Sequence, residues 1–230
     1  RVLVNGLPAR ELGARVRPGE DRVSVDGKEI SVRGKVYLLL HKPKGYLCSL
    51  QDRCGRRLVT ELVREIPERL YPVGRLDYDS EGLLILTNDG ALCQKLTHPR
   101  HEIRKTYLAE AASPPAPDAL RRLREGVEIG EERPTLPARV RMLCANAPLL
   151  EITIREGRNR QVRRMLAAVG NRVVRLRRVA LGPLKLGRLA PGEYRKLSES
   201  EVQALFAAAE KRCDYRSRPP CGPAGRVART

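Results

Sequence analysis

The segment GRLDYDSEGLLILTNDG, residues 74–90, gathers carboxylates that could do chemistry. It holds four acids, namely Asp77, Asp79, Glu81 and Asp89. The first three alternate and Gly82 follows them, as at the start of an EF-hand calcium loop. The segment therefore fits a metal site, or a single carboxylate that reacts by itself. The third alternative is a solvated acidic turn before a core strand.

The residues around these acids argue against calcium. An EF-hand loop has a bidentate Glu at its twelfth position, but the twelfth residue counted from Asp77 is Asn88. Pro72 and Gly74 stand where the entering helix would have to be. The run LLILT after Gly82 suits a buried strand better than a helix. We therefore expect no metal here, and the rest of the chain decides between catalysis and a turn.

The net charge indicates the kind of partner. The 230 residues include 45 Lys and Arg against 27 Asp and Glu, which gives a formal net charge of +18. This excess adds self-repulsion to a compact fold and indicates a polyanionic partner, either nucleic acid or an acidic membrane surface. No run approaches the length of a membrane-spanning helix, and no signal peptide is visible. The composition thus favours a nucleic-acid-binding protein of the cytoplasm, without a membrane.

Cysteine and histidine usage gives little support to a metal centre. The six cysteines form no C-x-x-C pair, which disfavours zinc ribbons and redox motifs and fits a reducing compartment. His98 and His101 in HPRH have a ligand-like interval, but no acid or cysteine partner is obvious nearby. We expect these two histidines to contact RNA or to form a surface turn.

Basic charge is densest in residues 155–178, REGRNRQVRRMLAAVGNRVVRLRR. This stretch has nine arginines, no lysine and one acid. Arginine can fork onto phosphates and stack on bases, which suits RNA. A solubilising helix face is the alternative, but such a face normally intersperses both signs of charge. The stretch therefore indicates an RNA-binding surface.

The elements that must position these residues can be read from the apolar pattern. An apolar strand, Val36 to Leu40, ends before Pro43, and LLILT (83–87) is a second strand. A helix is predicted in RLVTELVREIP (57–67), ending before Pro67. Asn88 or Asp89 is expected to cap a helix that runs through Leu96.

The second half of the chain mixes both kinds of element. Strands are predicted at 102–111, 138–143, 149–154 and 172–181. Helices are predicted at 117–126, at 160–170 and after a capping box formed by Ser198 and Glu201. The elements do not alternate strictly, so the fold class is α+β.

Three motifs together carry a resemblance to a known family. HKPKGYLCS (41–49), GRLDYDSEGLLILTNDG (74–90) and EGRNRQVRRML (156–166) occur in this order. The sequence resembles the RsuA/RluB-type pseudouridine synthases, which isomerise uridine in ribosomal RNA. KTYLAE (105–110) and the segment 174–197 extend the match. The resemblance implies the pseudouridine synthase fold, with a mixed, mostly antiparallel sheet, flanking helices and a central RNA-binding cleft.

The resemblance also divides the chain into parts. Residues 1–34 resemble the latter part of the alpha-L RNA-binding module, without its first helices, and Arg1 reads as an internal position of a longer chain. Residues 35–206 correspond to the catalytic domain. Residues 207–230 are expected to be a basic, disordered tail.

Site residues follow from the matched motifs. The resemblance assigns the essential carboxylate to Asp77, the active-site tyrosine to Tyr107 and the basic partner to Arg163, with Arg160 as the alternative. An arginine beside a carboxylate keeps it ionised, and an aromatic ring can hold a flipped-out base by stacking. The other three acids are then turn, cap and surface residues.

The isomerisation has no net exchange of atoms and no redox step, so no cofactor is expected. RNA contacts are expected from a set of basic and polar residues: Lys42, Lys44, Arg75, Lys105, Arg158, Asn159, Arg160, Gln161, Arg164, Arg175, Arg177 and Arg178.

The substrate follows from similarity alone. The segment YPVGRLDYDSEGLLILTNDG looks more like the large-subunit enzyme, which implies 23S ribosomal RNA. The alternatives are 16S ribosomal RNA, a non-catalytic RNA-binding assembly factor with the same fold, and a metal-dependent nuclease that uses the acid cluster. A monomer is expected.

Overall fold

A computed structural model describes residues 1–11, 13–17, 19–30, 34–144 and 147–210. It divides the chain into two compact units, Arg1–Val36 and Tyr37–Thr230, which are described separately. Residues 211–230, most of the predicted tail, lie outside the described residues.

The first unit contains a four-stranded antiparallel sheet in the order β2-β1-β3-β4. Its strands are Val2–Val4 (β1), Leu7–Pro8 (β2), Val23–Val25 (β3) and Lys28–Ile30 (β4). The Asn-Gly and Asp-Gly pairs turn the two hairpins, with φ of 52° at Asn5 and 50° at Asp26. Two successive residues with positive φ match the twist of the flanking strands, which explains these dipeptides.

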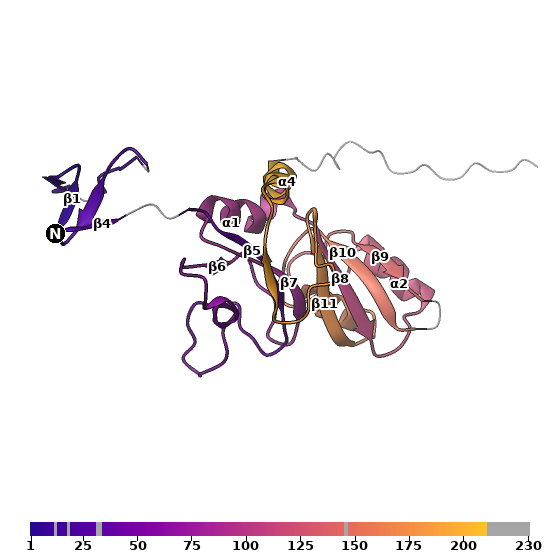
Figure 1. The fold of residues 1–230 in the computed structure, drawn as a ribbon. Coiled ribbons are helices and arrows are strands. Elements are labelled where there is room, and N and C mark those ends of the chain that lie inside the picture. Colours follow the sequence, from indigo (N-terminus) through magenta and orange to yellow (C-terminus); the bar gives the residue numbers. More distant parts are fainter. Residues whose placement is uncertain (12, 18, 31–33, 145–146, 211–230) are drawn as a thin grey trace, which may run out of the picture. The chain divides into compact units, whose positions relative to one another are not determined.

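The second unit is organised by a nine-stranded sheet with the order β13-β5-β7-β11-β8-β10-β9 (Figure 1). Its main strands are Tyr37–Lys42 (β5), Glu81–Thr87 (β7), Lys105–Ala111 (β8), Arg139–Met142 (β9), Leu149–Ile154 (β10), Val173–Leu181 (β11) and Tyr194–Lys196 (β13). Two short strands, Tyr71–Pro72 (β6) and Leu184–Lys185 (β12), pair with β7 and β11. Among these pairs only β7 and β11 run parallel. The expected mixed, mostly antiparallel sheet is confirmed.

Four α-helices accompany this sheet in the described part of the chain. They are Gly90–Thr97 (α1), Pro117–Glu125 (α2), Gln161–Ala168 (α3) and Glu199–Glu210 (α4). Asp89 caps α1 as predicted, accepting from the amides of Ala91 at 3.0 Å and Leu92 at 3.4 Å. The capping box of α4 is also confirmed, because Ser198 and Glu201 exchange amide-to-side-chain hydrogen bonds of 3.0 and 3.2 Å.

Two predictions about the helices are wrong, one on the type of a helix and one on where a helix ends. The segment 57–67 forms a 3-10 helix of five residues, Val59–Val63 (η1), and no α-helix. Three of these five residues are β-branched, which disfavours a regular α-helix. Helix α4 continues to Glu210, whose carboxylate pairs with Lys95 of α1 at 2.6 Å. Residues 207–210 are therefore the end of a helix and not tail.

The core lies on both faces of the central strands β5 and β7. Leu38 to Leu40 and Leu83 to Leu86 are completely buried. Leu39, Leu83 and Ile85 belong to one cluster with residues of α1 and α4, including Leu92 and Leu205. Strands buried on both faces need continuous apolar runs, which the sequence has. These strands give a rigid base to the loop that precedes β7.

Candidate active site

A cavity of about 290 Å³ opens beside the loop that leads into β7. Its lining comes from five separate parts of the chain, namely 73–80, 96–103, β8, 154–162 and β11. Asp77, Tyr107 and Arg160 all border it, although they come from distant motifs. The fold therefore brings the matched motifs to one place.

The loop that carries Asp77 is tied down from behind by Lys42 of β5. The ammonium group of Lys42 donates to the carbonyl oxygens of Pro43 at 3.1 Å, Asp77 at 3.0 Å and Ser80 at 2.8 Å. Lys42 is completely buried, and burial lowers its pKa. Its predicted role in RNA binding is wrong, because all three of its donors are engaged inside the protein.

Two further contacts shape the same loop. The Leu76 amide donates to the sulfur of Cys48 at 3.3 Å, and the Ser80 amide donates to the Asp77 carbonyl at 3.1 Å. Gly82 follows the loop because its backbone lies against Arg178 of β11. A Cβ there would be 2.2 Å from the Arg178 carbonyl oxygen, so only glycine fits.

The carboxylate of Asp77 is partly exposed, with 28% of its side-chain surface accessible. Its ion-pair partner is Arg160, whose Nη1 lies 4.0 Å from Asp77 Oδ2. This separation is an ion pair without a short hydrogen bond. Asp77 thus presents an open carboxylate to the cavity beside a cation.

Asp79 has different surroundings and binds two arginines. Arg160 donates to both of its oxygens at 3.0 Å, and Arg163 Nη2 lies 3.2 Å from Oδ2. The hydrogen bonds from Arg160 hold the pKa of Asp79 below its ordinary value. Asp79 was expected to be a turn residue, but the structure makes it the anchor of both guanidinium groups.

Arg163, the predicted partner of Asp77, is placed behind this anchor. Its guanidinium donates to the carbonyls of Asp79 at 3.1 Å and Val173 at 3.3 Å. Burial lowers its pKa, and it does not border the cavity. Arg160, the alternative, is therefore the residue that directly faces Asp77.

Arg160 also has an unusual backbone. It precedes α3 with φ 48° and ψ 33°, the left-handed region that side chains other than glycine rarely adopt. Such a conformation costs about 1–3 kcal/mol and persists where surrounding structure holds it, often at functional sites. Its contacts with Asp79 and Asp77 supply part of that hold.

Tyr107 and Lys105 lie two positions apart on β8 and both border the cavity. Tyr107 is buried, and within the described residues its hydroxyl has no hydrogen-bond partner. Lys105 is half-buried and donates to the carbonyl of Ile103 at 2.9 Å. Burial, reinforced by Arg178, lowers the pKa of Lys105 to about 8.

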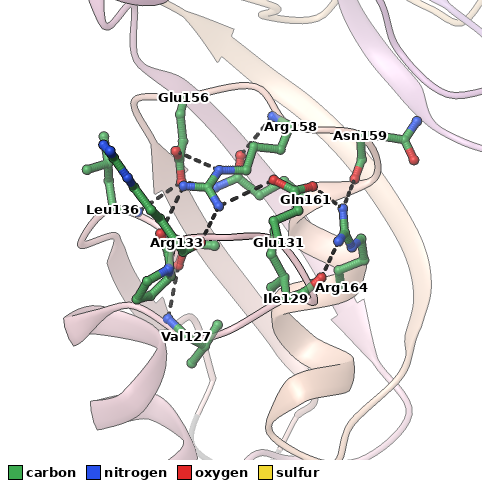
Figure 2. A network of polar contacts seen from close by, with 12 residues as sticks. Val127, Ile129, Glu131, Arg133, Leu136, Glu156, Arg158, Asn159, Gln161 and Arg164 are labelled. Atoms are coloured by element: carbon green, nitrogen blue, oxygen red, sulfur yellow. Dashed lines mark hydrogen bonds and ion pairs between the residues drawn. The ribbon is translucent and has the colours of Figure 1, made fainter.

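Three residues of the arginine-rich motif brace the protein itself (Figure 2). Arg158 donates to Glu156 at 3.0 Å and to the carbonyls of Arg133 and Pro134 at 2.6 and 2.8 Å. Gln161 donates to Glu156 at 2.6 Å. Arg164 pairs with Glu131 and donates to the Ile129 carbonyl. These contacts fix residues 129–136 against the start of α3.

The expected RNA contacts therefore divide into two groups. Arg158, Gln161 and Arg164 act as braces, and Arg178 is buried with Nε donating to the Leu83 carbonyl at 2.8 Å. Arg158, Gln161 and Arg178 also border the cavity, and for all four residues contact with RNA stays a prediction. Apart from Lys105 and Arg160, which are described above, the exposed or half-exposed members that remain are Lys44, Arg75, Asn159, Arg175 and Arg177.

Arg175 and Arg177 are held together by Glu81. Its carboxylate accepts from their Nε atoms at 2.8 and 2.7 Å. Glu81 is 6% exposed, so it is not the surface residue that the sequence predicted. Burial raises the pKa of this acid, but the two arginines together outweigh that effect and hold the pKa below its ordinary value. Both arginines retain exposed surface beside β7.

Sequence reasoning missed Glu102, which borders the cavity and pairs with Arg155 at 3.3 Å. Glu102 has a φ of 44°, in the left-handed region that glutamate rarely adopts. The sequence therefore carries no signal for this conformation. His98 and Pro99 also border the cavity. Across the described ranges, no group of three or more His, Cys, Asp or Glu side chains could hold a metal ion.

Membrane association was not expected. In the part of the chain that the structure describes, no helix is both long enough and apolar enough to span a bilayer.

Comparison with known proteins matches residues 36–168 to the RNA pseudouridylate synthase family. An uncharacterised RNA pseudouridine synthase of Aquifex aeolicus is 46% identical over 211 residues, which cover 90% of this chain and 84% of that protein. Ribosomal large subunit pseudouridine synthase B of Bacillus subtilis is 44% identical over 214 residues, 91% of this chain and 87% of that one. Ribosomal small subunit pseudouridine synthase A of Escherichia coli is 38% identical over 208 residues, with 89% of each chain covered.

A solved structure agrees with this match. The crystal structure of a pseudouridylate synthase aligns with a TM-score of 0.70 and 34% identity, covering 89% of this chain and 88% of the other.

Proposed function

Because the chain belongs to the RNA pseudouridylate synthase family and is an enzyme that isomerises uridine, we propose that it modifies ribosomal RNA with Asp77 as its reacting carboxylate. The observation that carries this proposal is the cavity in which Asp77, Tyr107 and Arg160 meet. All three come from the matched motifs, and the cavity is built from one chain. The enzyme is accordingly proposed to act as a monomer, in the cytoplasm.

The reaction breaks the bond between N1 of uracil and C1′ of ribose, turns the base and joins C5 to C1′. A carboxylate can assist by attacking the sugar or the base, or by accepting a proton from the sugar. Each route needs an ionised, accessible oxygen. Asp77 supplies one, and Asp79 does not, because its oxygens are occupied by Arg160 and Arg163.

Arg160 is the proposed electrostatic partner of Asp77. It approaches to 4.0 Å, which places a positive charge beside the carboxylate while leaving the carboxylate oxygens open. Arg163 is proposed to act indirectly, because it binds Asp79 and thereby supports the loop that carries Asp77. These roles differ from those that the resemblance implied, in which Arg163 was the basic partner of Asp77.

The target uridine has to leave its stack to reach the cavity. The volume of about 290 Å³ is at the lower end for small-molecule sites and suits one nucleotide better than a longer segment. Tyr107 is proposed to hold the extruded base by stacking, which contributes about 1–3 kcal/mol. Phosphate contacts are assigned to the exposed group, namely Lys44, Arg75, Asn159, Arg175 and Arg177.

We propose 23S ribosomal RNA as the substrate. The relative named for the large subunit is 44% identical, against 38% for the one named for the small subunit. The second candidate is 16S ribosomal RNA, because the latter relative also aligns over most of the chain.

The test uses transcripts of both RNAs labelled with tritium at C5 of uridine. Conversion replaces the C5–H bond, so tritium enters water. Release from the 23S transcript alone is expected, and release from the 16S transcript alone would overturn the assignment. Release from neither transcript would contradict the proposal that ribosomal RNA is the substrate.

A further inference from the structure

We propose that Lys105 is a further catalytic residue, whose ammonium group binds a carbonyl oxygen of the extruded uracil and stabilises the charge that forms when the glycosidic bond breaks. This inference rests on the proposed function. It concerns a residue that the sequence placed among general RNA contacts.

The first observation is a contrast between two lysines that are both withdrawn from solvent. An ammonium group has three donors. Lys42 uses all of its donors on the carbonyls of Pro43, Asp77 and Ser80. Lys105 has one partner within the described residues, the carbonyl of Ile103 at 2.9 Å. Lys42 is thus complete as an internal anchor, while two donors of Lys105 remain for a ligand.

The second observation is where these donors lie. Lys105 borders the same cavity as Asp77 and Tyr107. Its head group lies beside Gly157, where a Cβ would be 3.9 Å from the ammonium nitrogen. Gly157 belongs to the loop that leads to Arg160. The ammonium group therefore stands between β8 and the segment that carries the proposed partner of Asp77.

The third observation is the relation of Lys105 to Tyr107. Residues two apart on a strand share a face and lie about 7 Å from one another. A pyrimidine stacked on the ring of Tyr107 would have its polar edge within reach of a lysine side chain on the same face. Carbonyl oxygens on that edge accept hydrogen bonds. A lysine ammonium group can donate them, whereas an apolar side chain cannot.

Charged groups from every neighbouring segment border the cavity around Lys105: Glu102 before β8, Arg155 and Glu156 after β10, Arg178 on β11, and Asp77 on the loop before β7. Burial lowers the pKa of Lys105 first, Arg178 lowers it further, and Glu156 raises it, to a net value of about 8. At neutral pH the charged form still predominates. A weakly solvated ammonium is a stronger partner for developing negative charge than one in bulk water.

The chemistry balances without any change in Lys105. When the N1–C1′ bond breaks, its electron pair stays on uracil and spreads to the carbonyl oxygens. C5 then bonds to C1′, the C5 proton leaves to solvent and N1 takes up a proton. Lys105 keeps its own protons and acts by hydrogen bonding, strongest while the base is charged.

The test compares Lys105→Met with Arg104→Met in single turnovers of tritium-labelled ribosomal RNA by excess enzyme. Arg104 is exposed, adjacent in sequence and outside the cavity lining, so it controls for loss of one positive charge. Lys105→Met is expected to lower turnover by about a hundredfold, as loss of one transition-state donor does. RNA affinity by filter binding and the melting temperature should stay near wild type. Arg104→Met should keep wild-type turnover.

A pH profile of the wild-type enzyme and of Lys105→Met gives a second, independent readout. As pH rises through the pKa of about 8, the ammonium group is lost. Wild-type kcat/KM should therefore fall on the alkaline side, and the residual activity of Lys105→Met should not show that fall.

Two results would overturn the role of Lys105: turnover of Lys105→Met within about threefold of wild type, or the same alkaline fall in both proteins. Absence of pseudouridine with the wild-type enzyme would instead contradict the proposed function. The two failures are therefore distinguishable.

Discussion

Asp77 and Asp79 are two residues apart but have different electrostatic surroundings. Asp79 gives both oxygens to arginines, whereas Asp77 faces the cavity with Arg160 at 4.0 Å. A carboxylate that is already bound on both oxygens makes a poor nucleophile or base. The difference in contacts assigns anchoring to Asp79 and chemistry to Asp77.

Arg160 and Arg163 should therefore respond differently to substitution. Arg160→Met removes the cation beside Asp77, and we expect turnover to fall by about fivefold, since such a partly exposed pair contributes at most about 1 kcal/mol. Arg163→Met should leave more activity and lower the melting temperature, because Arg163 ties the loop to β11 through the Val173 carbonyl. Single-turnover rates and thermal melts of both variants check this. A larger loss of turnover from Arg163→Met, in a folded protein, would restore Arg163 as the basic partner of Asp77.

At the scale of elements, the loop before β7 is held from two sides. Lys42 of β5 binds its backbone carbonyls, and the arginines at the start of α3 bind the Asp79 side chain. The loop thus has fixed ends and one open carboxylate, which preorganises Asp77 without blocking it.

The clamp through Asp79 gives a prediction of its own. Asp79→Asn keeps the shape but loses the charge that holds Arg160 and Arg163, so we expect turnover to fall about tenfold with little change in RNA affinity. Asp52→Asn is the matched control. Asp52 also pairs with an arginine, Arg56, at a distance of 2.6 Å, but neither residue borders the cavity. The pKa of Asp79 in the folded protein lies below its ordinary value. The contacts of Asp79 with the two arginines should therefore persist from neutral pH into the mildly acid range, and they should be lost only as pH falls through this lowered pKa. Equal effects of the two substitutions would contradict the clamp.

Elements with a local cause were predictable from the sequence. The cap at Asp89, the capping box at Ser198 and the buried runs of β5 and β7 each depend on a few neighbouring residues. The sequence did not predict which polar residues face the cavity and which ones only hold the structure of the protein in place. Lys42 and Lys44 differ by two positions, yet one is completely buried and the other exposed.

The arginine-rich motif shows the physical reason. Arg158 and Arg164 meet Glu131, which lies 27 and 33 residues earlier. Pairing of that kind depends on how β10 and α3 pack, and no spacing in the sequence encodes it. Charge density therefore predicts an RNA-binding region, but it could not identify which arginines make their contacts inside the protein.

For the whole molecule, the net charge of +18 is the main source of long-range attraction to RNA. We expect the RNA contacts to come from the exposed set of Lys44, Arg75, Asn159, Arg175 and Arg177, since several other arginines bind groups inside the protein. Binding should therefore weaken steeply with salt, because each phosphate contact releases a counterion.

The salt slope can be assigned to residues. Replacing Lys44 and Arg75 together by Ala should make the slope of log K against log salt shallower by about 0.7 per lost contact with single-stranded RNA. Arg121→Ala is the control, since Arg121 is exposed on α2, pairs with Asp118 at 2.5 Å and lies outside the cavity lining. Filter binding over a range of salt concentrations measures all three. An unchanged slope for the double variant would remove these residues from the RNA contacts.

Asp77→Asn tests the central claim most directly. The substitution keeps the side chain's shape and leaves the Asp77 carbonyl to accept from Lys42, so the loop should stay in place. Measured as tritium release from labelled ribosomal RNA by excess enzyme, turnover should fall by at least about 10³-fold, since removal of an essential reacting group costs that much or more. RNA affinity and the melting temperature should remain near those of wild type. Residual turnover of more than about a few per cent in this folded, RNA-binding variant would contradict the assignment of Asp77 as the reacting carboxylate.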